Sequence, residues 1–576
     1  MRIIYTLILF FIINNLTGQI FPPNYAELNY TQVMFNYPEI KGASYYLVQI
    51  ASRQEVTVFD KNIVVQQYDS TTATLIKGLE FGKLYQWRYL AFDKDKEIIY
   101  TSDIHIFDIK KCNLVNKNYY HTKINNKNVV DDGLIFLDGS RVAINRAGDP
   151  VWFMPNNVID AWDIKMTKSG TITFLSKSGE EYFSGVEISI NGEILWETPK
   201  SGRISGDSIE YFHHDFKKMS NGNYMVLGNK LVTPKININA DRIWFGTVIE
   251  YNPQKKVVWS WDSQQYFPDR EIYDYSKMDE TKFKNIFNRQ TYDPAHLNSF
   301  YLDEKNDIIY LSFKYISRII KLKRSTGKVL ASYGESIQSE GTANGFFQYM
   351  HTPILLPDSN IALFSNNNFS EMSNSFKPAS VVVFSQPNKY SNVSKKIWEF
   401  SCDFDKLYPS YSIRAGNIIF MDNSDFLVNM GDPVSRIFEV NHNKKIVWDC
   451  YTEKFSEDSN KWGPSCNYRV SFTKSLYPIY FTLNNSYNLD TIYHAKNFHI
   501  EFKINNEGSN QDLYIVKYKL SNSLYNTIQT DIVLPGNTTS IDINFKDEKI
   551  KNQNINISVS SIAKPEFKRE LNFYIN

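Results

Sequence analysis

The feature that most constrains the fold of this chain is a pair of short phrases that recurs between residues 131 and 452. Each pair opens with a turn and an apolar strand. It ends, after a longer connection, with a turn and a strand that finishes in Trp or another apolar residue. The first phrase reads "TKSGTITFLSK", "MSNGNYMVLGN", "DEKNDIIYLSF", "LPDSNIALFSN" and "MDNSDFLVNMG". The second reads "NGEILWETP", "QKKVVWSWDS", "TGKVLASYG", "KKIWEFSCD" and "KKIVWDCYT".

The spacing of these pairs predicts the architecture. About 40 to 60 residues separate successive pairs, which is room for four strands and is the size of one β-propeller blade. The clear pairs follow a degenerate opening unit, "GLIFLDGSRVAINRAGDPVWF" (133–153). We therefore predict an all-β protein with a six-bladed β-propeller over residues 131–452. Two stacked β-sandwiches are the alternative, which the repeated Trp phrase disfavours.

The segments on either side lack the repeat and are predicted to form separate β domains. In residues 20–109, "GLEFGKLYQWRYLAFD" resembles the latter half of a fibronectin type III domain, in which Trp87 would pack inside a small sandwich. Residues 467–576 alternate like sandwich strands and carry no catalytic signal of their own. The high content of aromatic residues, 38 Tyr and 39 Phe, favours strands throughout.

The N-terminus, "MRIIYTLILFFIINNLTGQI", has the pattern of a secretory signal peptide over residues 1–18. A charged Arg2 precedes an apolar stretch, and the small residues Thr17 and Gly18 follow it. A buried first strand is the alternative. No later stretch reaches the roughly 18 apolar residues of a membrane span. We therefore expect a protein that does not span the membrane and is exported, either periplasmic or secreted.

The charge and motifs argue against several classes of partner. A formal net charge of +1 gives no reason to expect a nucleic acid as partner. The sequence contains no GxxxxGK[ST] phosphate loop and no CxxC or Cys/His zinc spacing. We therefore expect no bound cofactor and no structural metal.

The cysteines are Cys112, Cys402, Cys450 and Cys466. An oxidising compartment permits disulfides among them. Cys450 and Cys466 are closest in sequence and flank a polar loop, while Cys402 and Cys450 both follow a similar Trp-containing strand. Both pairings remain open at this level.

Three histidines stand at corresponding places when the units are aligned on their turns. His214 lies seven residues before Asn221, and His351 lies seven residues before Asp358. His296 stands at the same point in the unit between them, ahead of a turn that is two residues longer. This position begins the first strand of a blade, which lines the central channel of a propeller. We therefore predict that three imidazoles point into one axial pocket.

The neighbours of these histidines refine the prediction. Because successive side chains of a strand face opposite ways, only one of His213 and His214 should reach the channel, and the register favours His214. His213 would then pack beside it or orient it. In the second and sixth units, the residues near the corresponding place are Trp162 and Gly416. Trp162 could stack on an aromatic ligand or pack within its blade.

Two kinds of chemistry suit three converging imidazoles. They could bind a metal ion, as three-His zinc sites do, or they could handle an anionic group as nucleophile and proton donors. Asn298 lies two residues beyond His296 on the same face, and Lys314 would return on the next strand. An amide and an ammonium favour an oxyanion, because the ammonium would repel a metal cation.

At these residues the chain resembles the arylsulfotransferase (arylsulfate sulfotransferase) family. The resemblance is carried by "PAHLNSFYLDEKNDIIYLSFKYISRIIKLKRSTGKVLASYG", "QYMHTPILLPDSNIALFSNNN" and "HHDFKKMSNGNYMVLGN", and it covers about residues 150 to 450. It implies a six-bladed propeller with an N-terminal β domain. It also implies transfer of a sulfuryl group from a phenolic sulfate ester to a phenol, without the nucleotide sulfate donor.

The resemblance also assigns roles to residues. It places a transient sulfohistidine at His351 and the family's other two active-site histidines at His214 and His296. The family's active-site arginine falls at Lys314, which is a departure, because Lys cannot bind an oxyanion bidentately as Arg does.

The expected mechanism is a ping-pong reaction. His351 would attack sulfur, His214 or His296 would protonate the leaving phenolate, and Lys314 with Asn298 would hold the sulfuryl oxygens as substrate-binding groups. An exported propeller that binds a ligand or partner and catalyses nothing is the alternative.

Overall fold

The structure of this chain is a computed structural model. It describes residues 20–575 apart from 54–57, 112–118, 129, 156–159, 179–181, 207–208, 235–239, 267–282, 287–288, 335–341, 368–376, 405–409, 457–458, 486–496, 521–523, 547–552 and 566. The described residues form β-strands and a few short 3₁₀ turns, with no α-helix among them. The prediction of an all-β protein is confirmed.

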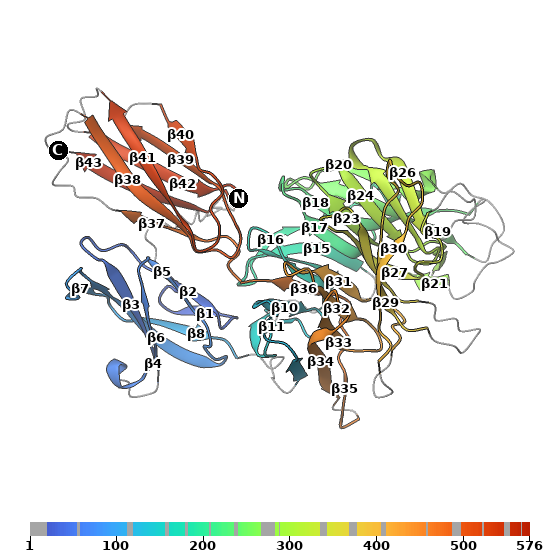
Figure 1. Cartoon of the computed structure of the whole chain (residues 1–576), viewed down its shortest axis with the longest axis horizontal. Coiled ribbons are helices and arrows are strands. Elements are labelled where there is room, and N and C mark those ends of the chain that lie inside the picture. Colours follow the sequence, from blue (N-terminus) through green and yellow to red (C-terminus); the bar gives the residue numbers. More distant parts are fainter. Residues whose placement is uncertain are drawn as a thin grey trace, which may run out of the picture. The chain divides into compact units, whose positions relative to one another are not determined.

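The chain divides into two compact units. The first unit joins residues 1–111 to residues 475–576, and the second unit comprises residues 112–474 (Figure 1). The second unit is therefore an insertion in the sequence of the first. It contains all the repeated phrases.

The described residues of the second unit form six sheets that follow one another along the chain, here called sheets 1 to 6, and their strands pair antiparallel except for β19 with β22 in sheet 3. Each is given from its inner to its outer strand. Sheet 1 is β36 (Val470–Thr473), β10 (Leu134–Leu137), β11 (Val142–Asn145) and β12 (Pro150–Phe153). Sheet 2 is β13 (Ala161–Met166), β14 (Ile172–Ser178), β15 (Tyr182–Ile188) and β16 (Ile194–Glu197). Sheet 3 is β17 (Phe212–Lys218), β18 (Tyr224–Val232), β19 (Arg242–Tyr251) and β20 (Val257–Asp262), extended by β22 (Arg289–Tyr292) and β21 (Phe283–Ile286).

The remaining sheets repeat this pattern. Sheet 4 is β23 (Leu297–Asp303), β24 (Ile308–Phe313), β25 (Arg318–Lys323) and β26 (Lys328–Gly334). Sheet 5 is β27 (Met350–Leu355), β28 (Ile361–Ser365), β29 (Ser380–Phe384) and β30 (Lys396–Ser401). Sheet 6 is β31 (Asn417–Phe420), β32 (Phe426–Met430), β33 (Arg436–Val440) and β34 (Ile446–Ser456), extended by β35 (Lys461–Pro464) and β9 (Tyr120–Ile124).

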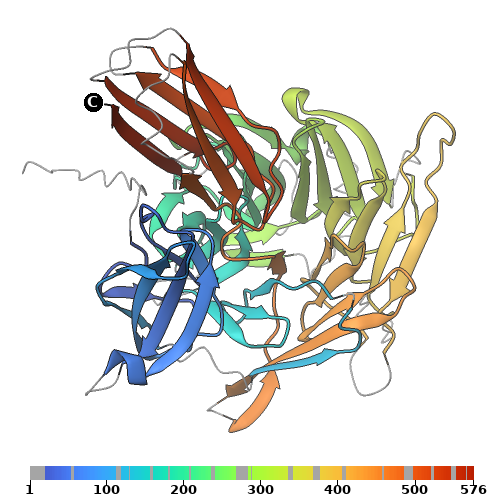
Figure 2. The same cartoon turned by 60° about the vertical axis from the view of Figure 1, so that its left-hand side comes forward.

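The inner strands meet in a cyclic order. β13 contacts β17, β17 contacts β23, β23 contacts β27 and β27 contacts β31. β31 then contacts β36 of sheet 1, and β36 contacts β13. The six sheets accordingly lie around a common centre (Figure 2).

Sheet 1 is built from two distant parts of the chain. β10 pairs antiparallel with β36, from Leu134 opposite Thr473 to Leu137 opposite Val470. β9 and β36 therefore belong to the second unit, although both lie outside the 131–452 range that the repeats mark. β36 lies in the range that the sequence assigned to the C-terminal domain, because this strand carries no copy of either phrase.

In four of the six described sheets, a Trp of the outer strand joins the sheet to the next one. The indole N–H of Trp152 donates to the carbonyl of Ile190 (2.9 Å), that of Trp196 to Pro253 (3.1 Å), and that of Trp398 to His442 (2.8 Å). Each acceptor lies in the turn before the outer strand of the following sheet. Trp448 of sheet 6 donates in the same way to Arg146 of sheet 1 (2.8 Å), which closes the ring.

The two sheets without this contact use other side chains. In sheet 3, Trp261 lies against Gly327 in the last turn of sheet 4, where a Cβ would stand 3.2 Å from the indole. In sheet 4, the Tyr333 hydroxyl donates to Gln386 of sheet 5 (2.9 Å). The recurrence of the phrase therefore has a physical cause, since each copy binds the neighbouring sheet.

The first unit has four sheets among its described residues. Its N-terminal part has a sheet of β1 (Ala26–Leu28), β8 (His105–Ile109), β6 (Lys83–Phe92), β3 (Tyr45–Ser52), β4 (Ile63–Asp69) and β7 (Ile98–Thr101), and a second sheet of β2 (Val33–Asn36) and β5 (Ala73–Ile76). Trp87 of β6 is fully buried, with its ring 4.9 Å from that of Phe35 in the second sheet. The two sheets therefore share a core.

The C-terminal part has one sheet of β37 (Phe481–Asn485), β38 (Asn497–Asn506) and β41 (Thr538–Lys546). Its other sheet is β40 (Asn526–Gln529), β39 (Tyr514–Leu520), β42 (Gln553–Ser561) and β43 (Lys568–Ile575). Phe502 of the first sheet and Val516 of the second belong to one buried apolar cluster. Arg569 links the two parts of this unit through Asn36 (3.2 Å).

Neither candidate disulfide is present in the structure. Cys402, Cys450 and Cys466 carry free thiols, and Cys112 lies outside the described residues. Cys402 and Cys450 are both fully buried, where desolvation raises the pKa of each thiol. Both cysteines act here as small apolar core residues.

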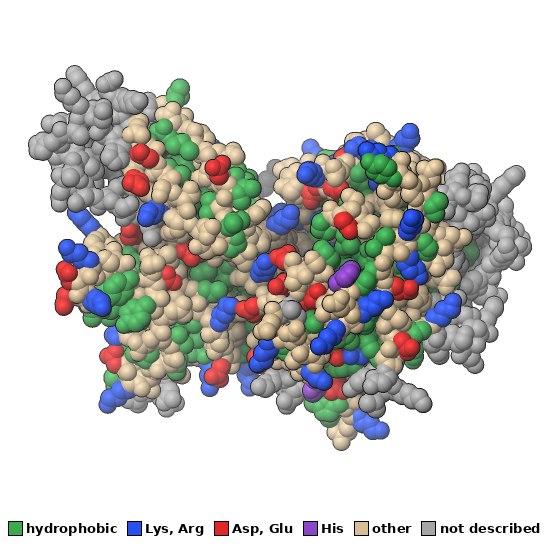
Figure 3. Space-filling view, viewed as in Figure 1, with side chains coloured by type: hydrophobic (Ala, Val, Ile, Leu, Met, Phe, Trp, Pro, Cys, Tyr) green, Lys and Arg blue, Asp and Glu red, His purple; other side chains and the backbone are tan. Residues whose placement is uncertain are grey.

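Two expectations concern the membrane and the surface. The predicted signal peptide, residues 1–18, lies outside the described residues. Within the described part of the chain, the structure contains no helix with the length and hydropathy of a membrane span. On the face seen in Figure 3, basic and acidic side chains are interspersed, in line with a net charge of +1.

The ring closure can be tested with Trp448→Phe. This change removes the donor to the Arg146 carbonyl and part of a fully buried ring. We expect a loss of about 2–4 kcal/mol in the free energy of unfolding, measured by urea titration with circular dichroism. Trp462→Phe on β35 is the control. Because that ring is 45% exposed, this change should lower the free energy of unfolding by no more than about 0.5 kcal/mol. Equal effects would contradict the role of the indole N–H.

Candidate active site

A cavity of about 670 Å³ lies at the centre of the second unit. Each of the six sheets contributes residues to its wall, and none of these residues lies on an outer strand. The lining residues are Asp138, Gly139, Arg141, Asp160, Ala161, Trp162, His214, His296, Lys314, Tyr315, His351, Arg414, Ala415, Asp432, Cys466, Asn467 and Tyr468. His214, His296, His351 and Lys314, which the sequence singled out, therefore face one cavity.

Bulges in the inner strands aim these side chains. The pairing register of β17, β23 and β27 shifts next to His214, His296 and His351 respectively. His214 (φ 58°) and His296 (φ 57°) hold the left-handed conformation. Residues other than glycine keep this conformation only where the surrounding structure enforces it, and such positions gather at functional sites.

His351 differs from the other two in its backbone. The left-handed residue of its bulge is Thr352 (φ 47°), whereas His351 itself stays in the ladder opposite Phe364. The expectation of one common position for all three histidines is therefore wrong in detail. A bulge adds residues to one strand and changes the direction of the side chains beside it. An alignment of the turns alone does not detect this change.

His213 fixes the orientation and tautomer of His214. The Nε2 of His213 lies 3.1 Å from the Gly228 carbonyl, which can only accept, so this nitrogen carries the proton. The Nδ1 of His213 is then an acceptor and receives the Nδ1–H of His214 at 2.6 Å. Burial, together with the nearby His296, lowers the pKa of His213 to about 4, so the ring is neutral near pH 7. In neutral His214 the lone pair therefore lies on Nε2.

Asp293 holds His296 in the same way. Its carboxylate accepts the backbone N–H of His296 at 3.0 Å and the ring Nδ1–H at 2.6 Å. A carboxylate on one ring nitrogen orients the imidazole and stabilises the imidazolium that forms when the other nitrogen takes a proton. The ring of His296 lies 4.8 Å from that of His214 and stacks on Tyr315 at 4.6 Å.

His351 is a neutral imidazole in a cationic setting. It is only 2% exposed, and neither ring nitrogen has a hydrogen-bond partner among the described residues. Desolvation, with the positive charges of Lys314 and Arg469 and the nearby His296, holds the pKa of His351 well below its usual value. One ring nitrogen therefore keeps its lone pair at neutral pH. Such a nitrogen is a competent nucleophile.

Lys314 supplies positive charge to the cavity wall. It follows β24, and its backbone N–H donates to the His296 carbonyl at 3.0 Å, which ties it to that histidine. Its side chain is largely buried, with Nζ 5.9 Å from the centre of the Tyr315 ring. A buried ammonium beside three imidazoles makes the cavity suited to an anion.

Asn298 lies elsewhere than predicted. It is fully buried and is not among the lining residues of the cavity. Its side-chain amide donates to the carbonyl of Met350 (2.9 Å), the residue before His351. The bulge of β23 falls at this residue and turns its side chain away from the face expected by alternation. Asn298 therefore positions the backbone that carries His351.

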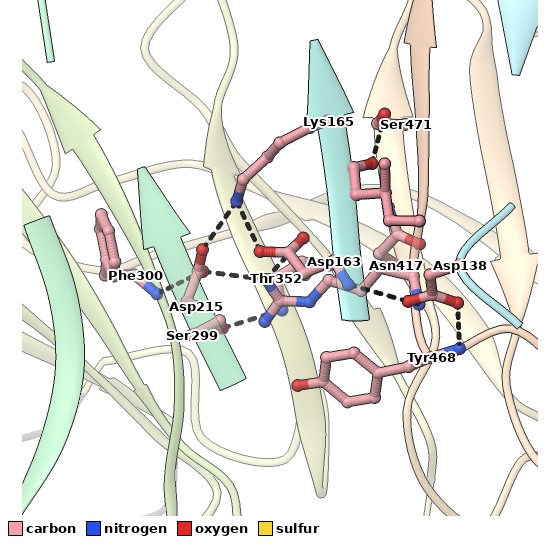
Figure 4. Close-up of polar contacts among 12 residues, drawn as sticks. Asp138, Asp163, Lys165, Asp215, Ser299, Phe300, Thr352, Asn417, Tyr468 and Ser471 are labelled. Carbon is pink, nitrogen blue, oxygen red and sulfur yellow. Dashed lines mark hydrogen bonds and ion pairs between the residues drawn. The ribbon is translucent and has the colours of Figure 1, made fainter. Parts of the chain in front are cut away.

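A buried ion network lies beside the cavity (Figure 4). Lys165 pairs with Asp163 (2.6 Å) and Asp215 (3.0 Å). Arg469 pairs with the same two carboxylates, at 3.5 Å and 2.9 Å, and also donates to the Asn298 carbonyl (2.8 Å). The network connects sheets 1, 2, 3 and 4 at their inner strands.

Several residues of this site escaped the sequence reasoning. Arg469 and Tyr468 come directly before β36, which carries neither repeated phrase. Asp293 precedes "PAH" by one residue, and a carboxylate three positions before a histidine was a usable signal. Asp163 and Asp215 occupy the inner strands of sheets 2 and 3, and their alignment was visible in "WDIKM" and "HDFKK".

The described residues contain no group of three His, Cys, Asp or Glu side chains arranged to hold a metal ion. His214, His296 and His351 share a cavity, and His214 and His296 each use one ring nitrogen on a neighbouring side chain.

The model of the Arylsulfotransferase (ASST) family matches residues 121–447. The chain belongs to the arylsulfotransferase family. This range contains the three histidines, Lys314, Asn298 and Asp293, whereas Tyr468 and Arg469 lie beyond it. Membership supports transfer of a sulfuryl group between small aromatic molecules in general.

The other comparisons give no further information on the function of this arylsulfotransferase. No curated protein matches the sequence. Similar solved structures include an α-L-arabinofuranosidase of Fusarium graminearum, with 12% identity over 66% of this chain and 93% of that one and a TM-score of 0.33. Another is the Cps50 (Swd1) β-propeller domain of Myceliophteria thermophila, with 8% identity over 51% and 88% and a TM-score of 0.28. The low identities and TM-scores give these likenesses no weight for the chemistry of the cavity.

The neutral state of His213 predicts a pH dependence of stability. Its folded pKa of about 4 lies below the ordinary value of 6.5, so between these pH values the unfolded chain binds a proton that the folded protein does not. Stability is therefore full above about pH 6.5 and falls towards pH 4, by about 3 kcal/mol from this residue. His213→Gln should flatten the pH dependence of the urea midpoint in this window. Parallel curves for the variant and the wild type would contradict a buried neutral His213.

Proposed function

We propose that this arylsulfotransferase is a six-bladed β-propeller in which sheets 1 to 6 are the blades. The cyclic contacts of the inner strands and the Trp contact from sheet 6 back to sheet 1 support this arrangement. The pairing of β10 with β36 supports closure of the first blade by the end of the same unit. The flanking sheets of the first unit would then form a fibronectin type III-like sandwich and a C-terminal sandwich.

We further propose that the central cavity transfers a sulfuryl group from a phenolic sulfate ester to a phenol through His351. The observation that carries this proposal is the buried, neutral imidazole of His351, which lies among cationic groups and has no hydrogen-bond partner in the described part of the chain. An anionic sulfate ester is attracted by Lys314, and the neutral ring nitrogen can still attack it. No cofactor is needed for this chemistry.

The first half-reaction forms sulfohistidine. The unprotonated nitrogen of His351 bonds to sulfur as the bond from sulfur to the aryl oxygen breaks. The leaving phenolate takes a proton from His296, whose imidazolium is held by Asp293. Like phosphoryl transfer, this step has a loose transition state with negative charge on the equatorial oxygens, which Lys314 stabilises.

The second half-reaction reverses these roles. An acceptor phenol binds in place of the first product and gives its proton to His296 as its oxygen attacks sulfur. The bond from sulfur to His351 breaks, and the imidazole returns to its neutral state. His214, oriented by His213, lies close enough to His296 to hold the aryl oxygen or relay its proton. Asn298 acts on the backbone next to His351 and does not contact the substrate.

The location of this reaction is also a proposal. The apolar N-terminal stretch, with its charged Arg2 and small residues at 17 and 18, supports export to the periplasm or the medium. Phenolic sulfates and phenols are small enough to enter a cavity of about 670 Å³. The net charge of +1 gives no reason to add nucleic acid as a partner.

The covalent intermediate can be tested directly. Incubation with p-nitrophenyl sulfate and no acceptor should place one sulfuryl adduct on the peptide containing "YMHTPILLP", detected by mass spectrometry. His351→Ala should abolish both adduct and transfer, whereas His296→Ala and His214→Ala should slow adduct formation by about 10²-fold or more. His121→Ala, an exposed histidine of β9, is the control and should behave as wild type. An adduct on His214 or His296 would contradict the assigned nucleophile, and no adduct with several donors would favour a binding protein.

The charge of Lys314 predicts two linked effects. Lys314→Ala should cost about 2–4 kcal/mol in the transition state, as loss of an oxyanion donor does. It should also move the acid limb of the rate profile to higher pH, because the Lys314 charge helps to lower the pKa of His351. Lys314→Arg should keep or raise kcat/KM, since the guanidinium binds oxyanions bidentately.

Lys305→Ala, which removes an exposed lysine in the turn after β23, is the matched control and should leave turnover and pH profile unchanged. Full turnover in Lys314→Ala with an unmoved acid limb would show that Lys314 does not act on the reacting group.

A further inference from the structure

Tyr468 places a second unpartnered polar group in the cavity. It lines the cavity just before β36, with its ring 6.5 Å from that of His351 and 5.9 Å from that of His214. Its hydroxyl is buried and has no hydrogen-bond partner among the described residues. The neighbouring His351 is in the same condition at both ring nitrogens.

The ring of Tyr468 is held in place by its neighbours. Its backbone N–H donates to Asp138 Oδ1 (2.9 Å), and the backbone N–H of Arg469 donates to Oδ2 of the same carboxylate (2.9 Å). Trp162 packs 5.2 Å from the ring on one side. The guanidinium of Arg469, fixed by its own ion pairs, lies 5.2 Å from the ring centre. The hydroxyl therefore cannot swing away to find a partner without disrupting this packing.

A rigid buried hydroxyl without a partner calls for an explanation. Such groups destabilise a folded protein, and phenylalanine would fill the same space without that cost. Desolvation raises the pKa of the Tyr468 phenol, so it keeps its proton at neutral pH and can only be a hydrogen-bond donor to an anion. His351 offers a lone pair and Tyr468 offers a proton to the same small volume.

We propose that the Tyr468 hydroxyl donates a hydrogen bond to a non-bridging oxygen of the sulfuryl group while that group is transferred to and held on His351. This inference rests on the proposed sulfuryl transfer. Tyr468 forms no bond to sulfur and gives up no proton, so its hydroxyl is unchanged at the end of each half-reaction. With Lys314 it makes an oxyanion site with one charged and one neutral donor.

The kinetic test uses Tyr468→Phe, which removes only the hydroxyl. With aryl sulfates whose phenols differ in acidity, kcat/KM should fall by about 10²-fold, as on loss of a preorganised oxyanion donor. The fall should be equal for good and poor leaving groups, because a non-bridging oxygen gains charge with every donor. A loss that grows with the basicity of the leaving phenol would overturn the assignment in favour of a contact with the aryl oxygen. A change below about twofold would overturn it altogether.

Tyr251→Phe is the matched control. Tyr251 of β19 also carries a buried hydroxyl with no partner among the described residues, but it lies in the apolar core between sheets 2 and 3 and does not line the cavity. Its loss should leave kcat/KM unchanged. The two variants should also have similar urea midpoints, which separates a catalytic contact from a structural one.

A binding measurement separates failure of this inference from failure of the proposed function. An aryl sulfonate presents the same three oxygens on a carbon–sulfur bond and cannot transfer its group. Calorimetry should show that Tyr468→Phe weakens its binding by about tenfold, whereas Tyr251→Phe does not. If wild type binds the sulfonate and depends on Tyr468 but turns over no aryl sulfate, the oxyanion contact stands and sulfuryl transfer fails. If Tyr468→Phe binds as well as wild type, the inference fails whatever the turnover.

Discussion

The hydrogen bond from an outer-strand Trp to the turn of the next sheet is the contact on which the second unit depends. It recurs at Trp152, Trp196, Trp398 and Trp448, and the last of these joins sheet 6 to sheet 1. Around Trp448 the Arg146 guanidinium lies 4.3 Å from the ring and is paired with the buried Glu439. An unpaired carbonyl or carboxylate there would be costly, so each sheet needs its neighbour.

In the proposed reaction, the charges beside His351 would favour both the attacking imidazole and its substrate. Burial disfavours protonation of this imidazole, and the charges of Lys314 and Arg469 add to the effect, so the ring keeps its lone pair. Positive charge in a buried cavity also attracts a sulfate ester and stabilises the charge that develops on its oxygens. Arg469 is held by two carboxylates, so the cavity gains local potential without an unpaired guanidinium. A single arrangement would thus serve both the resting state and the proposed reaction.

Sequence reasoning reached the parts of this site that repeat. The all-β class and the family were confirmed. His214, His296, His351 and Lys314 line one cavity, and this grouping could be predicted because the turns and the alternation of the strands are visible in the sequence. Asn298 was misplaced, since a bulge changes the direction of a side chain without leaving a composition signal. Tyr468 and Arg469 were missed because the strand they precede has no repeated phrase and pairs with a strand more than three hundred residues earlier. Such non-local pairing is set by tertiary contacts, which local patterns do not encode.

The place of β36 in the chain also sets the order in which the molecule can be completed during synthesis. The strands of sheets 2 to 6 and of β10 all leave the ribosome before Val470–Thr473. Until then the inner edge of β10 is unpaired, and the groups of Tyr468 and Arg469 are absent from the cavity. The first unit is completed later still, because its compact unit joins residues 1–111 to residues 475–576, which are synthesised last. An exposed strand edge is prone to pair wrongly. A chain that ends before β36 therefore lacks Tyr468 and Arg469 at the cavity and leaves the inner edge of β10 open to wrong pairing.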